Sequence, residues 1–306
     1  MARFGRVLSA MITPFDESGA LDLDEARRLA QWLQQHGHDG LVVAGTTGES
    51  PVLTDDERLS LIAAVAEAVT IPVVAGTCTN DTAHSLLLTA EAERLGAAGI
   101  LAVTPYYNRP SQAGIDAHIR AVASASRLPV MLYDIPVRSG RKMATATMLR
   151  LASEVPTVVA LKDAANNPGE TAALIAQAPE GFEVYSGEDM MTLPLLASGI
   201  VGTVGVATHW TGADHQQMFE LWESGDTGGA RRVNARLIES FVLEGGDDSP
   251  NPIPTKAVMR HLGFSVGQAR LPMGPAPEFV ERRVPEVLAA LERARADFAG
   301  ASAGRG

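Results

Sequence analysis

The apolar run Val130-Met131-Leu132-Tyr133 is followed by a helical pattern over Thr145–Ala152 and then by a second apolar run, Val158-Val159-Ala160-Leu161-Lys162. Apolar residues stand next to one another in both runs instead of alternating with polar ones, which is typical of parallel strands buried on both faces. The helical pattern between them has the length of the crossover that parallel strands need. This segment therefore predicts a strand, a helix and a second strand parallel to the first.

The same alternation extends over most of the chain. Further apolar runs predict strands at Val7–Ile12, Gly40–Ala44, Pro72–Ala75, Ile100–Thr104, Glu183–Ser186 and Gly202–Ala207. Amphipathic stretches predict helices at Asp22–His36, Asp55–Val69, Thr82–Leu95, Ala113–Ala125, Glu170–Gln177 and Met190–Ala197. Units spaced about 25–30 residues apart are expected to form an α/β fold, a (β/α)8 TIM barrel. A doubly wound open sheet is the alternative, but it would prefer a glycine-rich turn where Thr13-Pro14-Phe15-Asp16-Glu17 follows the first strand.

The strand pattern stops near Asp214. From there the sequence predicts helices at Phe219–Ser224, Gly229–Glu244, Thr255–His261 and Phe279–Ala296. We therefore expect two parts, a barrel over residues 1–225 that carries the active site and a C-terminal helical region over residues 226–306.

Composition excludes several classes of function. The 306 residues include 25 basic and 36 acidic side chains, a net charge of −11, without a cluster of Lys and Arg, so a nucleic-acid partner is not expected. The uncharged stretch Met190–Ala213 is interrupted by Pro194 and several glycines, which favours a core helix and a buried strand over a membrane span. The N-terminus lacks a signal-peptide pattern and Cys78 is the only cysteine, so a cytoplasmic location is expected. The scattered histidines show no metal-binding spacing, and no metal is expected.

Lys162 is the most informative single residue. Lys142, Lys162 and Lys256 are the only lysines among the 25 basic residues, and Lys162 ends an apolar strand. In a TIM barrel the active site forms at the C-terminal ends of the strands. Burial disfavours a charged ammonium, and a neutral amine is the nucleophile of Schiff-base chemistry. Lys162 is therefore the candidate nucleophile.

Polar residues follow the other predicted strands at the same end. The turn with Thr46 and Thr47 between two glycines can bind a carboxylate, although such turns are common. Tyr107 and Tyr133 are expected to face the site, although tyrosines also fill cores, and Tyr133 can carry a proton to a carbonyl oxygen. Arg138 can hold a carboxylate with its guanidinium fork, although it could also be a solvated surface residue. The grouping of these residues around a lysine favours a catalytic site.

The order and spacing of several motifs resemble one known family. The motifs are Gly45-Thr46-Thr47-Gly48-Glu49, Tyr106-Tyr107-Asn108-Arg109-Pro110, Tyr133-Asp134-Ile135-Pro136, Leu161-Lys162-Asp163, Asn251-Pro252-Ile253-Pro254-Thr255-Lys256 and Arg270-Leu271-Pro272-Met273. Together they resemble the dihydrodipicolinate synthase/N-acetylneuraminate lyase family over essentially the whole chain. The resemblance implies a lyase with a TIM barrel, usually a homotetramer built as a dimer of dimers. It also implies that no cofactor is needed beyond a covalent pyruvate imine.

The resemblance also implies roles around the lysine. Lys162 would condense with pyruvate, whose carboxylate would bind at the turn of Thr46 and Thr47. Tyr133 would relay protons, in a hydroxyl chain with Thr47 and with a Tyr107 donated by the neighbouring subunit.

The second substrate follows from the same resemblance. Arg138 occupies the position at which the synthases of the family bind the carboxylate of L-aspartate 4-semialdehyde, in the diaminopimelate route to lysine. Gly187 and the carbonyl of Val204 would line the pocket near the lysine.

One departure from the family concerns an effector site. Lysine-sensitive members carry histidines and a glutamate around a lysine pocket at the dimer interface. Here the corresponding positions are Asp55, Arg58 and His84, while Asn80 and Tyr106 remain. Since like charges repel at close range, an arginine and a histidine are poor hosts for an ammonium group. Weak or absent inhibition by lysine is therefore expected.

Two other functions remain open from the sequence. Another pyruvate-dependent aldolase or lyase of the same family could act on N-acetylneuraminate or a 2-keto-3-deoxy sugar acid, but such members usually lack an arginine at the position of Arg138. A catalytically silent paralogue that binds a metabolite would have no physical need to keep all of Thr46, Thr47, Tyr107, Tyr133, Arg138 and Lys162.

Overall fold

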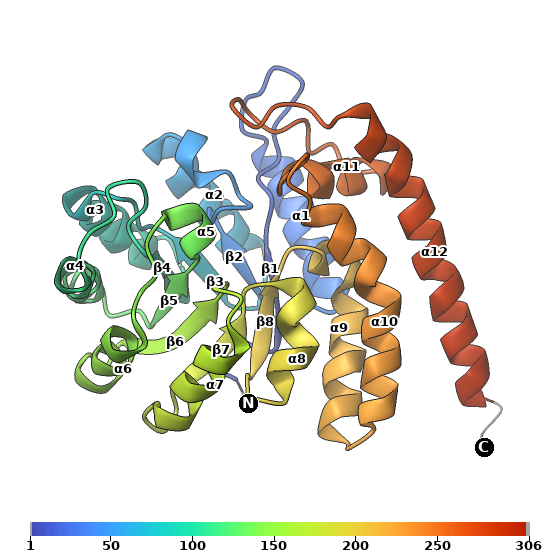
Figure 1. Cartoon of the computed structure of the whole chain (residues 1–306). Coiled ribbons are helices and arrows are strands. Elements are labelled where there is room, and N and C mark those ends of the chain that lie inside the picture. The colour runs from blue at the N-terminus through green and yellow to red at the C-terminus, as the bar shows by residue number, and fades with distance from the viewer. Residues whose placement is uncertain (1, 304–306) are drawn as a thin grey trace.

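The computed structural model describes residues 2–303 and contains a closed barrel of parallel strands (Figure 1). The strands are β1 Val7–Ala10, β2 Gly40–Val43, β3 Val73–Gly76, β4 Gly99–Val103, β5 Val130–Asp134, β6 Val158–Asp163, β7 Glu183–Ser186 and β8 Gly202–Gly205. Each strand pairs with the next in the sequence, and β8 pairs with β1. The predicted TIM barrel is confirmed and the open sheet is excluded.

Helices connect the strands around the outside of the barrel. They are α1 Leu23–Gln35, α2 Asp55–Ala68, α3 Thr82–Arg94, α4 Gln112–Ser124, α5 Pro136–Ser139, α6 Thr145–Glu154, α7 Pro168–Gln177, α8 Thr192–Leu196 and α9 Thr208–Glu223. Local chemistry fixes their starts: Asp22 caps α1, and Thr54 forms a reciprocal capping box with Glu57 at α2. These two helices thus begin where the sequence places acid and hydroxyl side chains.

Two helices differ from the sequence-based expectation. The short α5 was not predicted, because four residues carry no helical periodicity. Helix α9 begins at Thr208 and not at Phe219, since Thr211 interrupts its helical backbone geometry and the first turns contain small and polar residues. It follows β8 directly, as the other outer helices follow their strands.

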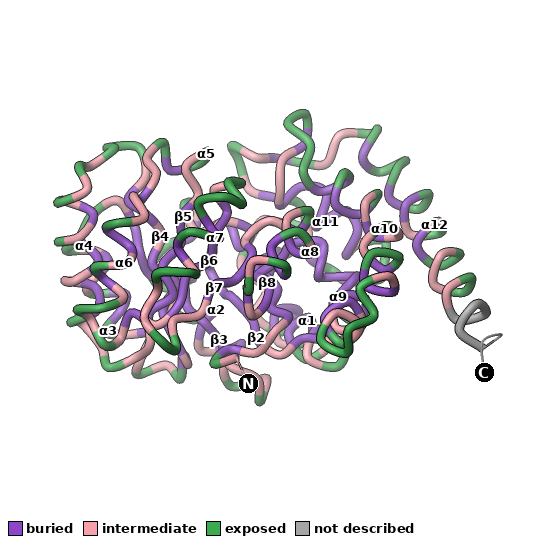
Figure 2. The backbone as a smooth tube through the Cα atoms, turned by 60° about the horizontal axis from the view of Figure 1, so that its bottom comes forward, coloured by how far each residue is buried: buried purple, intermediate pink, exposed green. Residues whose placement is uncertain are grey.

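The C-terminal helices pack beside the barrel. They are α10 Thr227–Glu244, α11 Ile253–His261 and α12 Glu278–Ala303, and α12 lies at the edge of the molecule opposite α3 and α4 (Figure 1). Their apolar residues form a hydrophobic cluster with α9, distinct from the cluster between the strands and the barrel helices. The strands are buried except for Val103, Val159 and Glu183, which are partly exposed, whereas the outer faces of the helices are exposed (Figure 2). The segment between α10 and α11 reaches the C-terminal ends of the strands.

Candidate active site

A cavity of about 390 Å³ opens at the C-terminal ends of the barrel strands. Six of the residues singled out from the sequence line it, namely Thr46, Thr47, Tyr133, Arg138, Lys162 and Gly187. They come from the connections after β2 and β5, from β5 and β6, and from the turn after β7. The rule that TIM-barrel sites form at this end of the strands therefore brings most of the candidate residues together.

Lys162 is buried in this cavity, with 4% of its surface exposed. It pairs in register with Tyr133 on β5, and its Nζ atom lies 4.4 Å from the centre of the Tyr133 ring. Asp163 turns to the other face of β6, where its carboxylate accepts hydrogen bonds from the hydroxyl of Thr171 at 2.6 Å and the N–H of Ala165 at 2.9 Å. The lysine thus lacks a carboxylate from its own strand and faces the aromatic ring of Tyr133.

Gly187 leaves room for the lysine. A Cβ atom at this position would lie 2.9 Å from Cγ of Lys162 and 3.0 Å from Cβ of Ala164. Contacts this short between carbon atoms are repulsive. A side chain at Gly187 would therefore displace Lys162 from its place in the cavity.

The turn after β2 is held by its own backbone and by the C-terminal region. Within the turn, the N–H of Glu49 donates to the carbonyl of Thr46 at 3.0 Å. The hydroxyl of Thr47 accepts a hydrogen bond from Nδ2 of Asn251 at 2.9 Å. The carboxylate of Glu49 forms a buried ion pair with Lys256 of α11, at 2.7 Å. The turn and the hydroxyl of Thr47 are therefore fixed at the cavity by residues about 200 positions away in the sequence.

Arg138 lies on the short helix α5, at the rim of the cavity. Its side chain is exposed, and Nη2 donates to the carbonyl of Asn251 at 3.3 Å. No carboxylate pairs with its guanidinium among the salt bridges of the described residues. The rest of its fork is thus available to a carboxylate ligand.

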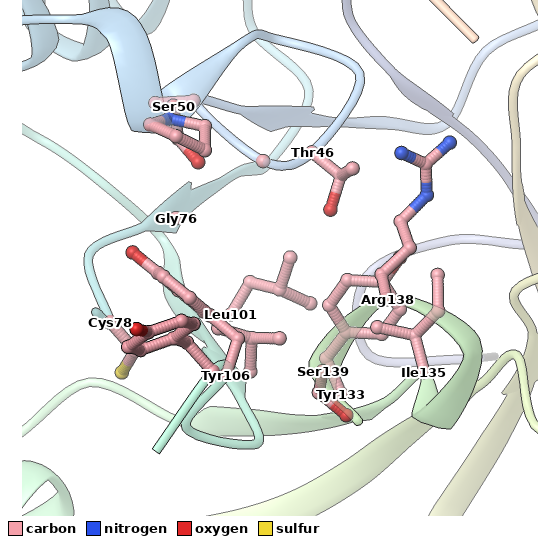
Figure 3. Close-up of a pocket in the computed structure, with 15 residues that line it drawn as sticks. Thr46, Ser50, Gly76, Cys78, Leu101, Tyr106, Tyr133, Ile135, Arg138 and Ser139 are labelled. Carbon is pink, nitrogen blue, oxygen red and sulfur yellow. The ribbon is translucent and has the colours of Figure 1, made fainter. Parts of the chain in front are cut away.

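A second cavity of about 310 Å³ adjoins the first one (Figure 3). Thr46, Tyr133 and Arg138 line both cavities, whereas Tyr106 and Tyr107 line only the second. Tyr107 is 88% exposed, and its φ angle of 71° is rare for a side chain of its size. The structure thus places Tyr107 away from Lys162 of its own chain.

Val204 is the other candidate that the Lys162 cavity does not include. Its side chain is fully buried on β8, in the cluster inside the barrel that also contains Tyr133 and Tyr185. Val206, two residues further along, lines the cavity in its place.

Four of the five positions of the expected effector site, Asp55, Arg58, His84 and Tyr106, interact with one another, and Asn80 has a contact of its own. The carboxylate of Asp55 pairs with Nε2 of His84 at 2.8 Å, and the carbonyl of Asn80 accepts from the amide of Asn108 at 3.0 Å. Arg58 is buried, and Nη2 donates to the carbonyl of Ser50 at 2.7 Å. Burial lowers the pKa of Arg58, and the neighbouring Tyr106, Asp55 and Cys78 oppose this shift. These residues lie close to the second cavity, which Ser50, Cys78 and Tyr106 line.

The sequence analysis missed an acidic wall of the first cavity. Glu188, Asp189 and Glu244 line it together with Asn251. Burial raises the pKa of Glu188, and it raises the pKa of Glu244 well above its usual range. Asn251 stood within a motif that we quoted. Glu188 and Asp189 stand just beyond the end of the predicted strand Glu183–Ser186, where the sequence places the site, but we assigned them no role from the sequence. Glu244 ends a helix outside the barrel, and only the fold brings it to the site.

Cys78 lines the second cavity but is poorly suited to act as a nucleophile. Burial raises the pKa of the Cys78 thiol to about 12, so the thiolate is scarce at neutral pH. Within residues 2–303, no group of three or more His, Cys, Asp or Glu side chains is arranged to hold a metal ion. Over the same residues, every helix is too short or too polar to span a bilayer.

Comparisons with known proteins point to one family. The model of the dihydrodipicolinate synthetase family matches residues 3–291. The 4-hydroxy-tetrahydrodipicolinate synthase of Moorella thermoacetica is 46% identical over 288 residues, which cover 94% of this chain and 98% of that protein. The enzyme of the same name from Acidothermus cellulolyticus is 47% identical over 291 residues, covering 94% of this chain and 93% of that protein. The crystal structure of the Cyanidioschyzon merolae protein with lysine bound superposes with a TM-score of 0.93 at 40% identity, covering 95% of this chain and 99% of that one.

Proposed function

The chain belongs to the dihydrodipicolinate synthetase family, and we propose that it condenses pyruvate with L-aspartate 4-semialdehyde to 4-hydroxy-tetrahydrodipicolinate. One observation supports this most directly. The buried amine of Lys162 lies 4.4 Å from the Tyr133 ring, in a cavity that Arg138 also lines. An amine nucleophile, a phenol and a cation that fits a carboxylate are the groups that this condensation needs.

The first half of the reaction would occur at Lys162. Its neutral amine adds to the carbonyl carbon of pyruvate, and water leaves as the imine forms. The imine nitrogen withdraws electrons, so the methyl group of pyruvate loses a proton and becomes the nucleophilic carbon of an enamine. The ring of Tyr133 covers the amine, and its hydroxyl is the nearest side-chain acid–base group on the paired strand β5. The turn of Thr46 and Thr47 supplies hydroxyl groups for the pyruvate carboxylate.

The second half would join the two substrates. The enamine carbon attacks the aldehyde carbon of the semialdehyde, whose oxygen takes a proton and becomes a hydroxyl group. The amino group of the semialdehyde then attacks the imine carbon and displaces the amine of Lys162. Ring closure and release of the enzyme are therefore the same step, and no external reductant or oxidant enters. The chemistry of this family needs no metal cofactor.

Assembly and location belong to the same proposal. A homotetramer, built as a dimer of dimers, would place the exposed Tyr107 in the site of a neighbouring subunit. We propose that Tyr107 there completes the hydroxyl chain with Tyr133 and Thr47, in a cytoplasmic enzyme. We also propose that the carbonyl of Val204 lies near the imine. The division between the barrel and the C-terminal helical region at residue 225 stays a prediction.

Turnover tests the proposed reaction. The protein is mixed with pyruvate and L-aspartate 4-semialdehyde, and consumption of both is followed together with formation of the heterocycle. We expect consumption in a one-to-one ratio. If pyruvate forms its imine but only N-acetylmannosamine or a sugar aldehyde is consumed, the enzyme is a sugar-acid aldolase of the same family. If no aldehyde is consumed and no imine forms, the protein is a silent paralogue.

A further inference from the structure

The semialdehyde of the proposed reaction carries two charged groups on one carbon atom, a carboxylate and an ammonium. Arg138 offers donors to the carboxylate, but its positive charge repels the ammonium. An ammonium group has three N–H donors and no acceptor, so it needs acceptors around it. A cavity that selects the amino-acid aldehyde must therefore hold acceptors beside Arg138.

Glu244 is an acidic side chain in that position. It lines the same cavity as Arg138 and Lys162, and only 6% of its surface is exposed. Arg138 is the positive group whose charge acts on its carboxyl. Glu244 is the last residue of α10, and the chain runs from it to Asn251, whose carbonyl accepts from Arg138 at 3.3 Å. The segment from Glu244 to Asn251 thus lies against Arg138.

Asp189 lines the same cavity as Glu244. Burial raises the pKa of Glu244 well above its usual range, and the charges of Asp189 and Glu188 raise it further. Asp189 is 1% exposed and accepts the N–H groups of Val206 at 2.8 Å and Ala207 at 3.0 Å, so its position is fixed by the backbone. Burial and these neighbouring charges favour the neutral form of Glu244. An arriving ammonium would supply the positive charge that favours ionised Glu244, and the proton of the Glu244 carboxyl would leave to solvent.

Asn251 provides a second acceptor. Its Nδ2 atom donates to the hydroxyl of Thr47 at 2.9 Å, which directs the amide and fixes the position of its oxygen. That oxygen, Oδ1, is buried and receives no hydrogen bond from any residue in the described part of the chain. A buried acceptor without a donor is costly, and a ligand donor would satisfy it. Glu188, by contrast, lies where the charge of Lys162 acts on it.

We propose that Glu244 and the amide oxygen of Asn251 bind the ammonium group of L-aspartate 4-semialdehyde while Arg138 binds its carboxylate. This inference rests on the proposed function and deepens it. It makes Glu244 the residue that distinguishes the amino-acid aldehyde from neutral aldehydes. It also provides for ring closure, since the ammonium must lose a proton before its nitrogen can attack the imine. The Glu244 carboxylate accepts that proton and becomes a neutral acid as the amine becomes a nucleophile.

The test compares two aldehydes in the Glu244→Gln variant of the full-length protein. Glutamine keeps the size of the side chain, but it cannot take a negative charge. L-aspartate 4-semialdehyde is the substrate, and succinic semialdehyde, which lacks the amino group, is the competitive inhibitor. Glu239→Gln is the matched control, because Glu239 lies on the same helix and pairs with Arg283 at the surface. Trapping of the pyruvate imine with borohydride reports whether the variant site is intact.

We expect Glu244→Gln to raise KM for L-aspartate 4-semialdehyde by about tenfold or more, the loss of a hydrogen bond to a charged group. The inhibition constant of succinic semialdehyde and imine trapping should stay as in the wild type. Glu244→Asp, which keeps the charge, should recover part of the loss. If both aldehydes weaken equally, or if neither changes, the inference is overturned. If the wild type traps pyruvate but does not consume the semialdehyde, the proposed function has failed and the inference falls with it.

Discussion

Arg138 shows what a single side chain contributes to this site. It lines both cavities, and among the described residues only one of its guanidinium nitrogens has a partner, the carbonyl of Asn251 at 3.3 Å. Lysine keeps the charge but cannot make two parallel hydrogen bonds to a carboxylate. We predict that Arg138→Lys raises KM for the semialdehyde by about tenfold, whereas borohydride trapping of pyruvate on the enzyme is unchanged. Steady-state kinetics with the semialdehyde varied would measure the change.

Arg141→Lys is the control for that substitution. Arg141 lies three residues further along the chain, and its Nη2 atom donates to the carbonyl of Arg109 at 3.1 Å, outside both cavities. Its KM should equal that of the wild type. If Arg138→Lys leaves KM as unchanged as Arg141→Lys does, the charge of Arg138 is sufficient and its two parallel hydrogen bonds are not needed.

Some site residues could be predicted from the sequence. Others could not, because their place in the site depends on tertiary packing. Lys162 ends an apolar strand and Thr47 lies in the turn after another, and the closed barrel brings all strand ends to one rim, so strand pattern located both residues. Glu244 lies at the end of a helix outside the barrel, and its place depends on how α10 packs. Tertiary packing of that kind leaves no periodic signal in the sequence.

At the scale of elements, one ion pair connects the turn after β2 to α11. The carboxylate of Glu49 and Nζ of Lys256 lie 2.7 Å apart, and each side chain is 1% exposed. Burial lowers the pKa of Lys256 to about 8, against the attraction of Glu49. Removal of one partner would leave the other charge buried without compensation. We predict that Lys256→Met lowers the free energy of unfolding by about 3 kcal/mol or more, as measured by denaturant titration.

A surface pair provides the comparison. Arg283 and Glu239 lie 2.8 Å apart on α12 and α10, with 44% and 62% of their side chains exposed. Exposed pairs contribute little, so Arg283→Met should change the free energy of unfolding by about 1 kcal/mol or less. An effect of Lys256→Met no larger than that of Arg283→Met would mean that the buried pair does not hold the turn.

The elements themselves were largely predictable. Every predicted strand coincides with an observed one to within two residues at either end, because runs buried on both faces contrast sharply with the polar connections. Helix α9 was the exception. Its first turns, Thr208-His209-Trp210-Thr211-Gly212, are buried and contain few apolar residues, so hydrophobic periodicity could not reveal them.

At the scale of the whole molecule, the charged residues near the second cavity determine whether a cationic effector such as lysine can bind there. His84 is paired with Asp55 at 2.8 Å, and the buried guanidinium of Arg58 lies beside Tyr106. The carboxylate of Asp55 is therefore already paired with His84, and Arg58 adds a positive charge nearby. Both features disfavour an ammonium ligand. We predict that lysine inhibits turnover weakly or not at all. An inhibition series that reached half-inhibition at submillimolar lysine would contradict this.

Oligomeric assembly was expected only from the resemblance to the family, because no pattern in the sequence itself indicates it. Tyr107 is 88% exposed although it belongs to a motif next to the site. The sequence places it after β4 but does not say into which subunit it points. An exposed aromatic side chain beside a catalytic cavity is consistent with a neighbour that covers it.

The central claim is that Lys162 forms an imine with pyruvate, and borohydride trapping tests it most directly. The protein is incubated with pyruvate and borohydride, weighed intact by mass spectrometry, and digested to locate the adduct. We predict one reduced pyruvyl group per chain, on Lys162, and none in the Lys162→Arg variant. An adduct on Lys142 or Lys256, or a wild-type protein that stays unmodified while the semialdehyde is still consumed, would contradict the Schiff-base mechanism.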